Sequence, residues 1–118
     1  KGNIALPGGF LKHDLNIEDS MLTELKEETR IKVVGGIDML KKSIKDHKEF
    51  DHPGRSQRGR TVTHAFLIKL PDGGDLPKVK GDDDASGAFW MPIADIFRYE
   101  NEFYEDHAHI IDYFTRRL

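Results

Sequence analysis

The 118-residue sequence contains no cysteine, and this absence excludes disulfide bonds and thiolate zinc sites. We therefore expect a reducing compartment, the cytoplasm. No apolar run approaches the roughly 20 residues that a membrane-spanning helix requires, so no membrane-embedded segment is expected. An excess of positive charge is also absent. The formal net charge is -3, which argues against nucleic acid as the main partner.

The composition is that of a folded domain. Hydrophobic residues make up 37% of the chain and charged residues 33%, whereas disordered chains combine low hydrophobicity with high net charge. The length suits one compact domain with one core. The chain starts at Lys1 rather than at a methionine, and residues 3–6 resemble the end of a strand. We therefore expect residues 1–118 to form a single domain, a fragment of a longer chain that lacks its first strands.

The order of the predicted elements is typical of an α/β fold. Asn16 is a suitable N-cap for a helix over residues 17–29, and alternating apolar residues predict a strand over residues 61–70. Residues 37–50 fit a helix or a strand, and we favour a strand. The remaining predicted elements are strands over residues 3–6, 31–34 and 88–91, and helices over residues 92–97 and 104–117. Helices among and after the strands favour an α/β/α sandwich with a mixed sheet.

Three glutamates of the predicted helix, Glu24, Glu27 and Glu28, are spaced three or four residues apart and project from one face. Like charges at this spacing destabilise a helix by about 0.2–0.5 kcal/mol per pair, and a divalent cation would remove that cost. Carboxylate oxygens are the ligands that Mg²⁺ prefers. We therefore interpret these glutamates as metal-binding and catalytic residues. The spacing alone leaves open a solvated acidic face.

The segment that contains these glutamates resembles the signature of the Nudix family, G-x5-E-x7-R-E-U-x-E-E-x-G-U. The residues that match it in register are Gly9, Glu24, Leu25, Glu27, Glu28 and Ile31. Three positions differ. Leu15 replaces the first glutamate, Thr23 replaces an arginine that helps to orient the glutamates in the family, and Arg30 replaces the last glycine.

Similarity continues outside this signature. The segments that carry it are residues 50–56, 58–66, 79–85, 89–92, 104–107 and 110–111. They resemble the branch of the family in which the Nudix domain is joined to a nicotinamide mononucleotide adenylyltransferase. This resemblance implies an α/β/α Nudix fold, Mg²⁺ or Mn²⁺ as cofactor, and hydrolysis of ADP-ribose to AMP and ribose 5-phosphate within NAD metabolism. The nucleotidyltransferase half is absent from these 118 residues, and the resemblance allows a homodimer.

Two further groups of residues are predicted to bind the substrate. They are the glycine turn with its flanking ring, Gly8, Gly9 and Phe10, and three arginines of one loop, Arg55, Arg58 and Arg60. Glycine lets a substrate approach the backbone closely, and guanidinium groups match phosphate oxygens. The arginines could instead form a solvated basic loop. Asp83 and Asp84 lie in an acidic loop, and either could deprotonate the attacking water or merely belong to a polar turn.

Two other functions remain open. The changes at Leu15 and Thr23 favour a domain that senses ADP-ribose or a related nucleotide without cleaving it. The signature alone also permits hydrolysis of another dinucleotide, such as NADH or a diadenosine compound. Only the segments outside the signature argue for ADP-ribose.

Overall fold

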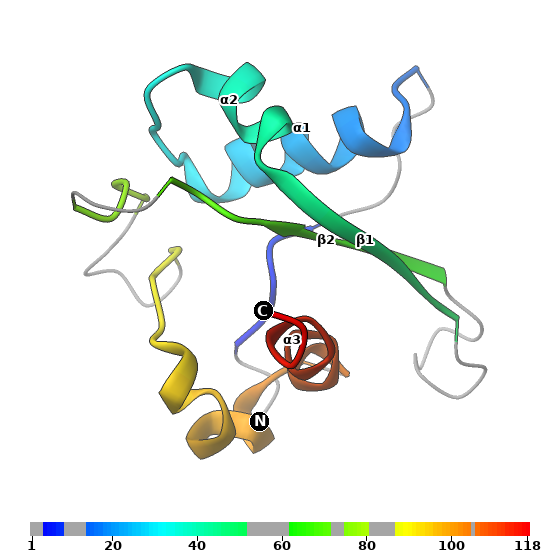
Figure 1. Cartoon of the computed structure of the whole chain (residues 1–118). Helices are drawn as coiled ribbons and strands as arrows, with labels where there is room; N and C mark the ends of the chain where they lie inside the picture. Colours follow the sequence, from blue (N-terminus) through cyan, green and yellow to red (C-terminus); the bar gives the residue numbers. More distant parts are fainter. Residues whose placement is uncertain (1–3, 9–13, 52–61, 72–74, 81–86, 105) are drawn as a thin grey trace. The chain divides into compact units, whose positions relative to one another are not determined.

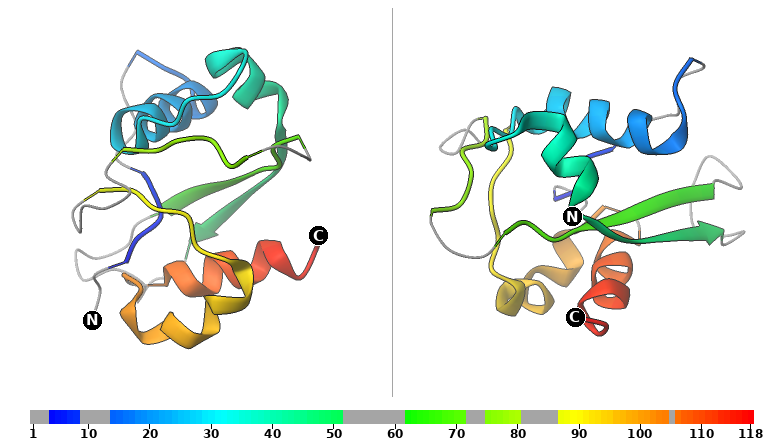
Figure 2. Two further views of the ribbon diagram at one scale, coloured as in Figure 1. Left: turned by 90° about the vertical axis from the view of Figure 1, so that its left-hand side faces the viewer. Right: turned by 45° about the horizontal axis from the view of Figure 1, so that its top comes forward.

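A computed structural model of the chain describes residues 4–8, 14–51, 62–71, 75–80, 87–104 and 106–118 (Figures 1 and 2). The elements are α1 (Ile17–Thr29), α2 (Gly36–Lys42), β1 (Ile44–Asp51), β2 (Val62–Ile68), the 3-10 helices η1 (Ile93–Asp95) and η2 (Phe97–Glu102), and α3 (His107–Thr115). The chain divides into two compact units. The first unit comprises Lys1–Leu6, Asp46–Leu67 and Met91–Leu118, and the second unit comprises Pro7–Lys45 and Ile68–Trp90.

Helix α1 confirms the prediction for residues 17–29 at both ends. The side chain of Asn16 accepts a hydrogen bond from the Asp19 backbone N–H at 2.7 Å, which satisfies one of the unpaired donors of the first turn. Leu22 is only 1% exposed and anchors the helix in the core of the second unit. The residues of that core and its margin are Leu22, Ile31, Leu40, Met21, Leu25, Val33, Ile68, Leu70 and Val79.

The strand favoured over residues 37–50 is wrong in its first half, because helix α2 precedes β1 there. Gly35 adopts φ 95°, and a Cβ at this position would lie 2.8 Å from the Cβ of Met39, so the turn that starts α2 requires glycine. In the second unit, α2 lies beside α1 and buries Leu40 (Figures 1 and 2). The apolar residues of α2 fit both the helical and the strand period, and burial of Leu40 selects the helix.

The predicted strand over residues 31–34 is also wrong. The Lys32 N–H donates to the Lys78 carbonyl at 3.2 Å, and the Lys80 N–H donates to the Thr29 carbonyl at 2.6 Å. Thr29 and Lys32 are three residues apart, whereas their partners Lys80 and Lys78 are two residues apart. One extra residue on the first segment therefore disrupts the regular ladder, as in a β-bulge.

The predicted strand over residues 88–91 has no regular pairing among the described residues. Its backbone is tied to the second unit by one bond, from the Ala88 N–H to the Lys80 carbonyl at 2.8 Å. The indole of Trp90 donates to the Pro77 carbonyl at 2.8 Å. A side-chain contact therefore holds this segment where the sequence suggested a backbone ladder.

Strands β1 and β2 pair antiparallel, which confirms the strand predicted over residues 61–70 (Figure 1). Across the pair, His47 Nε2 lies 3.2 Å from His64 Nδ1, and the His47 ring stacks on Phe66. The predicted strand over residues 3–6 is reduced, within its described part, to a parallel bridge between Ile4 and Phe103.

The core of the first unit contains Ala65, Ile110 and Phe114, and Leu6, Phe50, Leu67 and Tyr113 pack against it. The Phe50 ring meets Tyr113 edge-on, with ring centroids 5.5 Å apart. Helix α3 confirms the predicted terminal helix but begins at His107, three residues later than expected, and the predicted short helix after Pro92 consists of two 3-10 helices. Within the part of the chain that the structure describes, no helix combines the length and apolarity needed to cross a membrane.

Candidate functional site

The three predicted metal-binding glutamates lie on the second half of α1. Glu24 is half-buried, whereas Glu27 and Glu28 are exposed. Leu22 and Leu25 belong to the core of the second unit, and this packing directs the helix so that the glutamates occupy a different side. The amphipathic pattern thus leaves these carboxylates accessible to a ligand.

The glycine turn and the glutamate helix are joined by a direct hydrogen bond. The Gly8 backbone N–H donates to Glu28 Oε1 at 2.8 Å. Hydrogen bonds to carboxylates are short and stronger than those between neutral groups, so this contact orients the Glu28 side chain. A carboxylate has two oxygens, and Oε2 is still able to coordinate a cation.

The end of α1 is fixed by Thr29, a residue that the sequence analysis did not single out. Its buried hydroxyl donates to the Leu25 carbonyl at 2.7 Å and accepts the Ile31 N–H at 3.2 Å. Arg30 then ends the helix in the left-handed conformation, with φ 54° and ψ 31°. The Nudix signature has glycine at this position, and glycine is the residue that adopts this conformation without steric cost.

The carboxylates of Glu24, Glu27 and Glu28 are suited to a hard divalent cation. Within the described residues, no group of three or more histidine, aspartate or glutamate side chains is positioned to hold a metal. Glu24, Glu27 and Glu28 therefore do not form a closed carboxylate cage. Mg²⁺ typically binds through one or two carboxylates and completes its coordination with water and substrate phosphates. The glutamates of α1 offer carboxylate oxygens of the kind that such an open site uses.

The other predicted site residues fall into two groups. Leu15 and Thr23, the altered signature positions, are described and half-buried. Neither offers the carboxylate or the guanidinium that the signature has there. The remaining predicted residues, Gly9, Phe10, Arg55, Arg58, Arg60, Asp83 and Asp84, lie outside the described residues.

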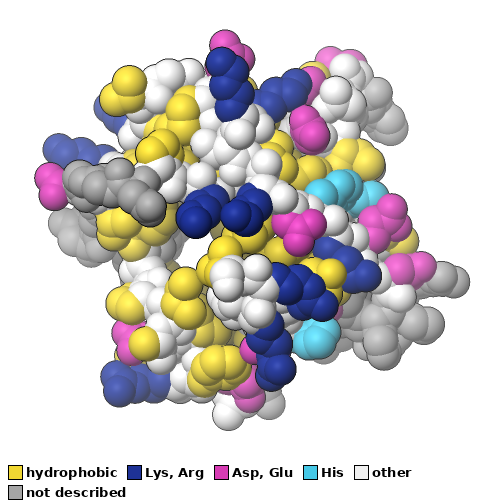
Figure 3. Space-filling view, viewed as in Figure 1, with side chains coloured by type: hydrophobic (Ala, Val, Ile, Leu, Met, Phe, Trp, Pro, Cys, Tyr) yellow, Lys and Arg dark blue, Asp and Glu magenta, His cyan; other side chains and the backbone are white. Residues whose placement is uncertain are grey.

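The structure also contains a basic pocket that the sequence analysis missed. It has a volume of about 230 Å³ and is lined by Arg30, Lys32, Lys78, Val79 and Lys80. On the face seen in Figure 3, basic and acidic side chains are interspersed, whereas no described residue that lines this pocket carries a carboxylate. The alternation of Arg30-Ile31-Lys32 and of Lys78-Val79-Lys80 was the signal in the sequence. This alternation forms a pocket only because the two segments pair in the folded chain.

Comparison with known proteins identifies the class to which this fold and this glutamate helix belong. The NUDIX domain model matches residues 1–114, and the chain belongs to this family. Among curated relatives, the ADP-ribose pyrophosphatase of Methanocaldococcus jannaschii is 30% identical over 97 residues, which cover 79% of this chain and 48% of that protein.

Two solved structures from Francisella tularensis are also similar. Both are bifunctional NMN adenylyltransferase/ADP-ribose pyrophosphatases, and one was crystallised with AMP and a manganese ion. With that structure the TM-score is 0.86 at 35% identity, covering 96% of this chain and 33% of the other. The second gives 0.85 at 35% identity, covering 95% and 32%. The predicted Nudix fold is thus confirmed. The chain spans about half the length of the curated relative and a third of each solved chain.

Proposed function

We propose that the chain is a divalent-metal-dependent pyrophosphohydrolase that cleaves ADP-ribose to AMP and ribose 5-phosphate. The observation that carries this proposal is the arrangement on α1, where Glu24, Glu27 and Glu28 share a helix and Glu28 is oriented by the Gly8 N–H at 2.8 Å. The ADP-ribose pyrophosphatase activity of the relatives supports the substrate, and the manganese ion in one of the similar structures supports the metal.

In the proposed reaction, Glu24, Glu27 and Glu28 would supply carboxylate oxygens to Mg²⁺ or Mn²⁺, and the ion would neutralise charge on the phosphate oxygens and lower the pKa of water. Water attacks one phosphorus of the pyrophosphate, a P–O bond forms, and the bridging P–O bond breaks. The two phosphate halves leave as AMP and ribose 5-phosphate. Gly8 keeps Glu28 in place during this exchange.

The proposal assigns further roles by resemblance. Gly9, Phe10, Arg55, Arg58 and Arg60 bind the anionic substrate, and Asp83 or Asp84 accepts the proton of the attacking water. Function in the cytoplasm, in the turnover of NAD-derived nucleotides, is part of the same proposal.

The test is Mg²⁺-dependent release of AMP from ADP-ribose, followed by chromatography. Replacing Glu28 by glutamine should abolish it, because an amide is a poor ligand for a hard cation. Glu18→Gln is the matched control, because Glu18 is exposed in the first turn of the same helix, away from the glutamate cluster. Equal activity of Glu28→Gln and the parent chain would overturn the proposed mechanism.

A second function, binding without turnover, is favoured by one observation. Thr23 stands on α1 one turn before Glu27 and lacks the guanidinium that the signature supplies. A domain with poorly oriented glutamates would bind ADP-ribose and release no AMP. Calorimetry with ADP-ribose and Mg²⁺, run beside the turnover assay, separates a sensor from an enzyme.

A further inference from the structure

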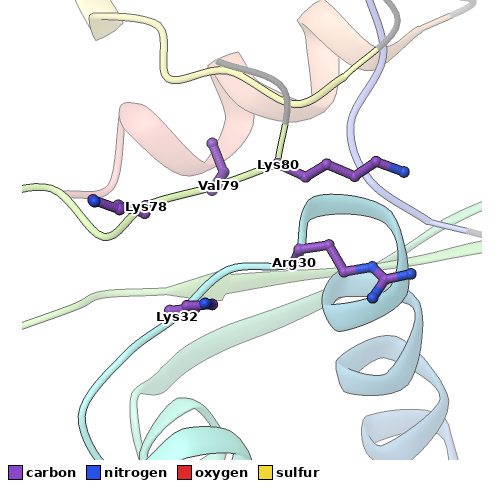
Figure 4. A pocket seen from close by; sticks show the side chains of 5 residues that line it. All are labelled: Arg30, Lys32, Lys78, Val79 and Lys80. Carbon is purple, nitrogen blue, oxygen red and sulfur yellow. The ribbon is translucent and has the colours of Figure 1, made fainter. Parts of the chain in front are cut away.

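The basic pocket is built by two short segments that run side by side within the second unit. Two backbone hydrogen bonds join them, from Lys80 to Thr29 and from Lys32 to Lys78. The pairing brings residues about 50 positions apart in the sequence to the two walls of one pocket (Figure 4). The cations are thus held on a fixed backbone frame.

Burial alternates along both segments. Ile31 is 5% exposed and belongs to the core, and Val79 packs against the same core. The neighbouring residues Arg30, Lys32, Lys78 and Lys80 are exposed. In extended backbone, successive side chains point to opposite faces, so core packing of Ile31 and Val79 leaves their neighbours Lys32, Lys78 and Lys80 on the exposed side. In Figure 4, the Val79 side chain turns away from the side chains of Arg30 and Lys32.

The four cations have no anionic partner among the described residues. The described residues that line the pocket include no aspartate or glutamate, and no ion pair within the same part of the chain involves any of the four. Positive charges around one pocket raise the local electrostatic potential, and this potential favours an anionic ligand. The whole chain carries a net charge of -3, so the excess of positive charge at the pocket is opposite in sign to the charge of the chain.

The backbone of Arg30 is strained at the end of α1, where the Nudix signature has glycine. Its φ of 54° makes it the one non-glycine residue with positive φ among those described. Left-handed conformations are unfavourable for residues with a Cβ, and such strain is concentrated at functional sites. An arginine in this conformation places a planar guanidinium, which can form two parallel hydrogen bonds to a phosphate, at the pocket wall.

We propose that this basic pocket binds a diphosphate group, either free pyrophosphate or the diphosphate end of a nucleotide. Its volume of about 230 Å³ lies below the range of about 300–1,000 Å³ that is typical of sites for larger ligands. It therefore suits a compact anion rather than a whole dinucleotide. The charge of a diphosphate also suits a lining that contains several cations and, among the described residues, no carboxylate.

The proposal is tested by calorimetric titration of the 118-residue chain with inorganic pyrophosphate, with EDTA present so that no metal contributes. Saturable binding is expected, and the double variant Lys32→Gln/Lys80→Gln should weaken it at least 10-fold. The matched control is Lys42→Gln/Lys69→Gln, which removes the same charge from exposed positions outside the pocket. It should weaken binding less than 2-fold. Titration with ADP and with AMP separates a nucleotide diphosphate from a monophosphate.

Two further variants distinguish this site from the glutamate site and from a structural role. Glu28→Gln should bind pyrophosphate as the parent chain does, whatever its effect on hydrolysis. Arg30→Gly should bind pyrophosphate at least 5-fold more weakly although glycine suits its backbone. The alternative is a structural role for the pocket lysines. Lysines at an exposed strand edge discourage pairing with another chain, and this role requires no ligand. Absence of pyrophosphate binding, or equal weakening in the pocket and control variants, would overturn the proposal.

Discussion

The Gly8 backbone N–H donates to Glu28 Oε1 at 2.8 Å. This bond connects the glycine turn, which is expected to receive the substrate, to the helix that is expected to hold the metal. The two residues are 20 positions apart in the sequence. The contact gives Glu28 a role besides the proposed metal coordination, because it tethers the turn to the helix and fixes one of the Glu28 oxygens.

Glu28→Gln should separate these two roles. The amide Oε1 still accepts the Gly8 N–H, so the free energy of unfolding should change by less than about 0.5 kcal/mol, as is usual at exposed sites. Loss of a residue that orients a metal ligand typically costs about 10–100-fold, so loss of the ligand itself should lower kcat/KM for ADP-ribose at least about 100-fold. Urea unfolding and steady-state kinetics of the same preparation measure both. A variant that unfolds easily but retains turnover would contradict this division of roles.

Arg30→Gly should stabilise the chain. Arg30 has φ 54°, and the left-handed conformation costs a residue with a Cβ about 1–2 kcal/mol. Glycine avoids this cost but loses more entropy on folding, so the net gain should be about 0.5–1 kcal/mol in urea unfolding. Arg30→Ala is the control, since it keeps the Cβ and should bring no such gain. Equal stability of the glycine and alanine variants would show that backbone strain is not relieved at this position.

Thr29→Val should loosen the end of α1. The Thr29 hydroxyl accepts the Ile31 N–H at 3.2 Å, and both residues are buried. Valine leaves that N–H without this partner, which costs about 1–3 kcal/mol of unfolding free energy. Thr29→Ser keeps the hydroxyl and should lose clearly less. Hydrogen exchange of the Ile31 amide provides a local measurement, and unchanged protection in Thr29→Val would count against the bond.

Leu22→Ala should test the core that positions the glutamates. Leu22 is 1% exposed, and truncating a buried leucine typically costs about 2–5 kcal/mol. Leu76→Ala is the control, because Leu76 is 65% exposed and its truncation should stay within about 0.5 kcal/mol. Thermal and urea unfolding measure both variants. Similar losses at the two positions would mean that α1 is not anchored through Leu22.

Features that depend on neighbouring residues in the chain were predictable. Helix α1 was predicted at both ends, because Asn16 caps its start and its apolar residues repeat with the helical period. The strand β2 was predicted from its alternation of side chains. Glu24, Glu27 and Glu28 were predicted to share a helix because three- and four-residue spacing is a local property of that helix.

Tertiary structure decided what local patterns left open. The pattern of residues 37–42 fits a helix or a strand and we favoured the strand, but burial of Leu40 selects the helix. The pattern after α1 predicts a strand, but the segment pairs with residues 78–80 with a mismatch of one residue. The bond between Gly8 and Glu28 and the pocket between Arg30 and Lys80 likewise join distant residues. The sequence by itself determined each segment's conformational preference and the Nudix signature. Only the folded chain decided which segments meet, because pairing and burial depend on residues far apart in the sequence.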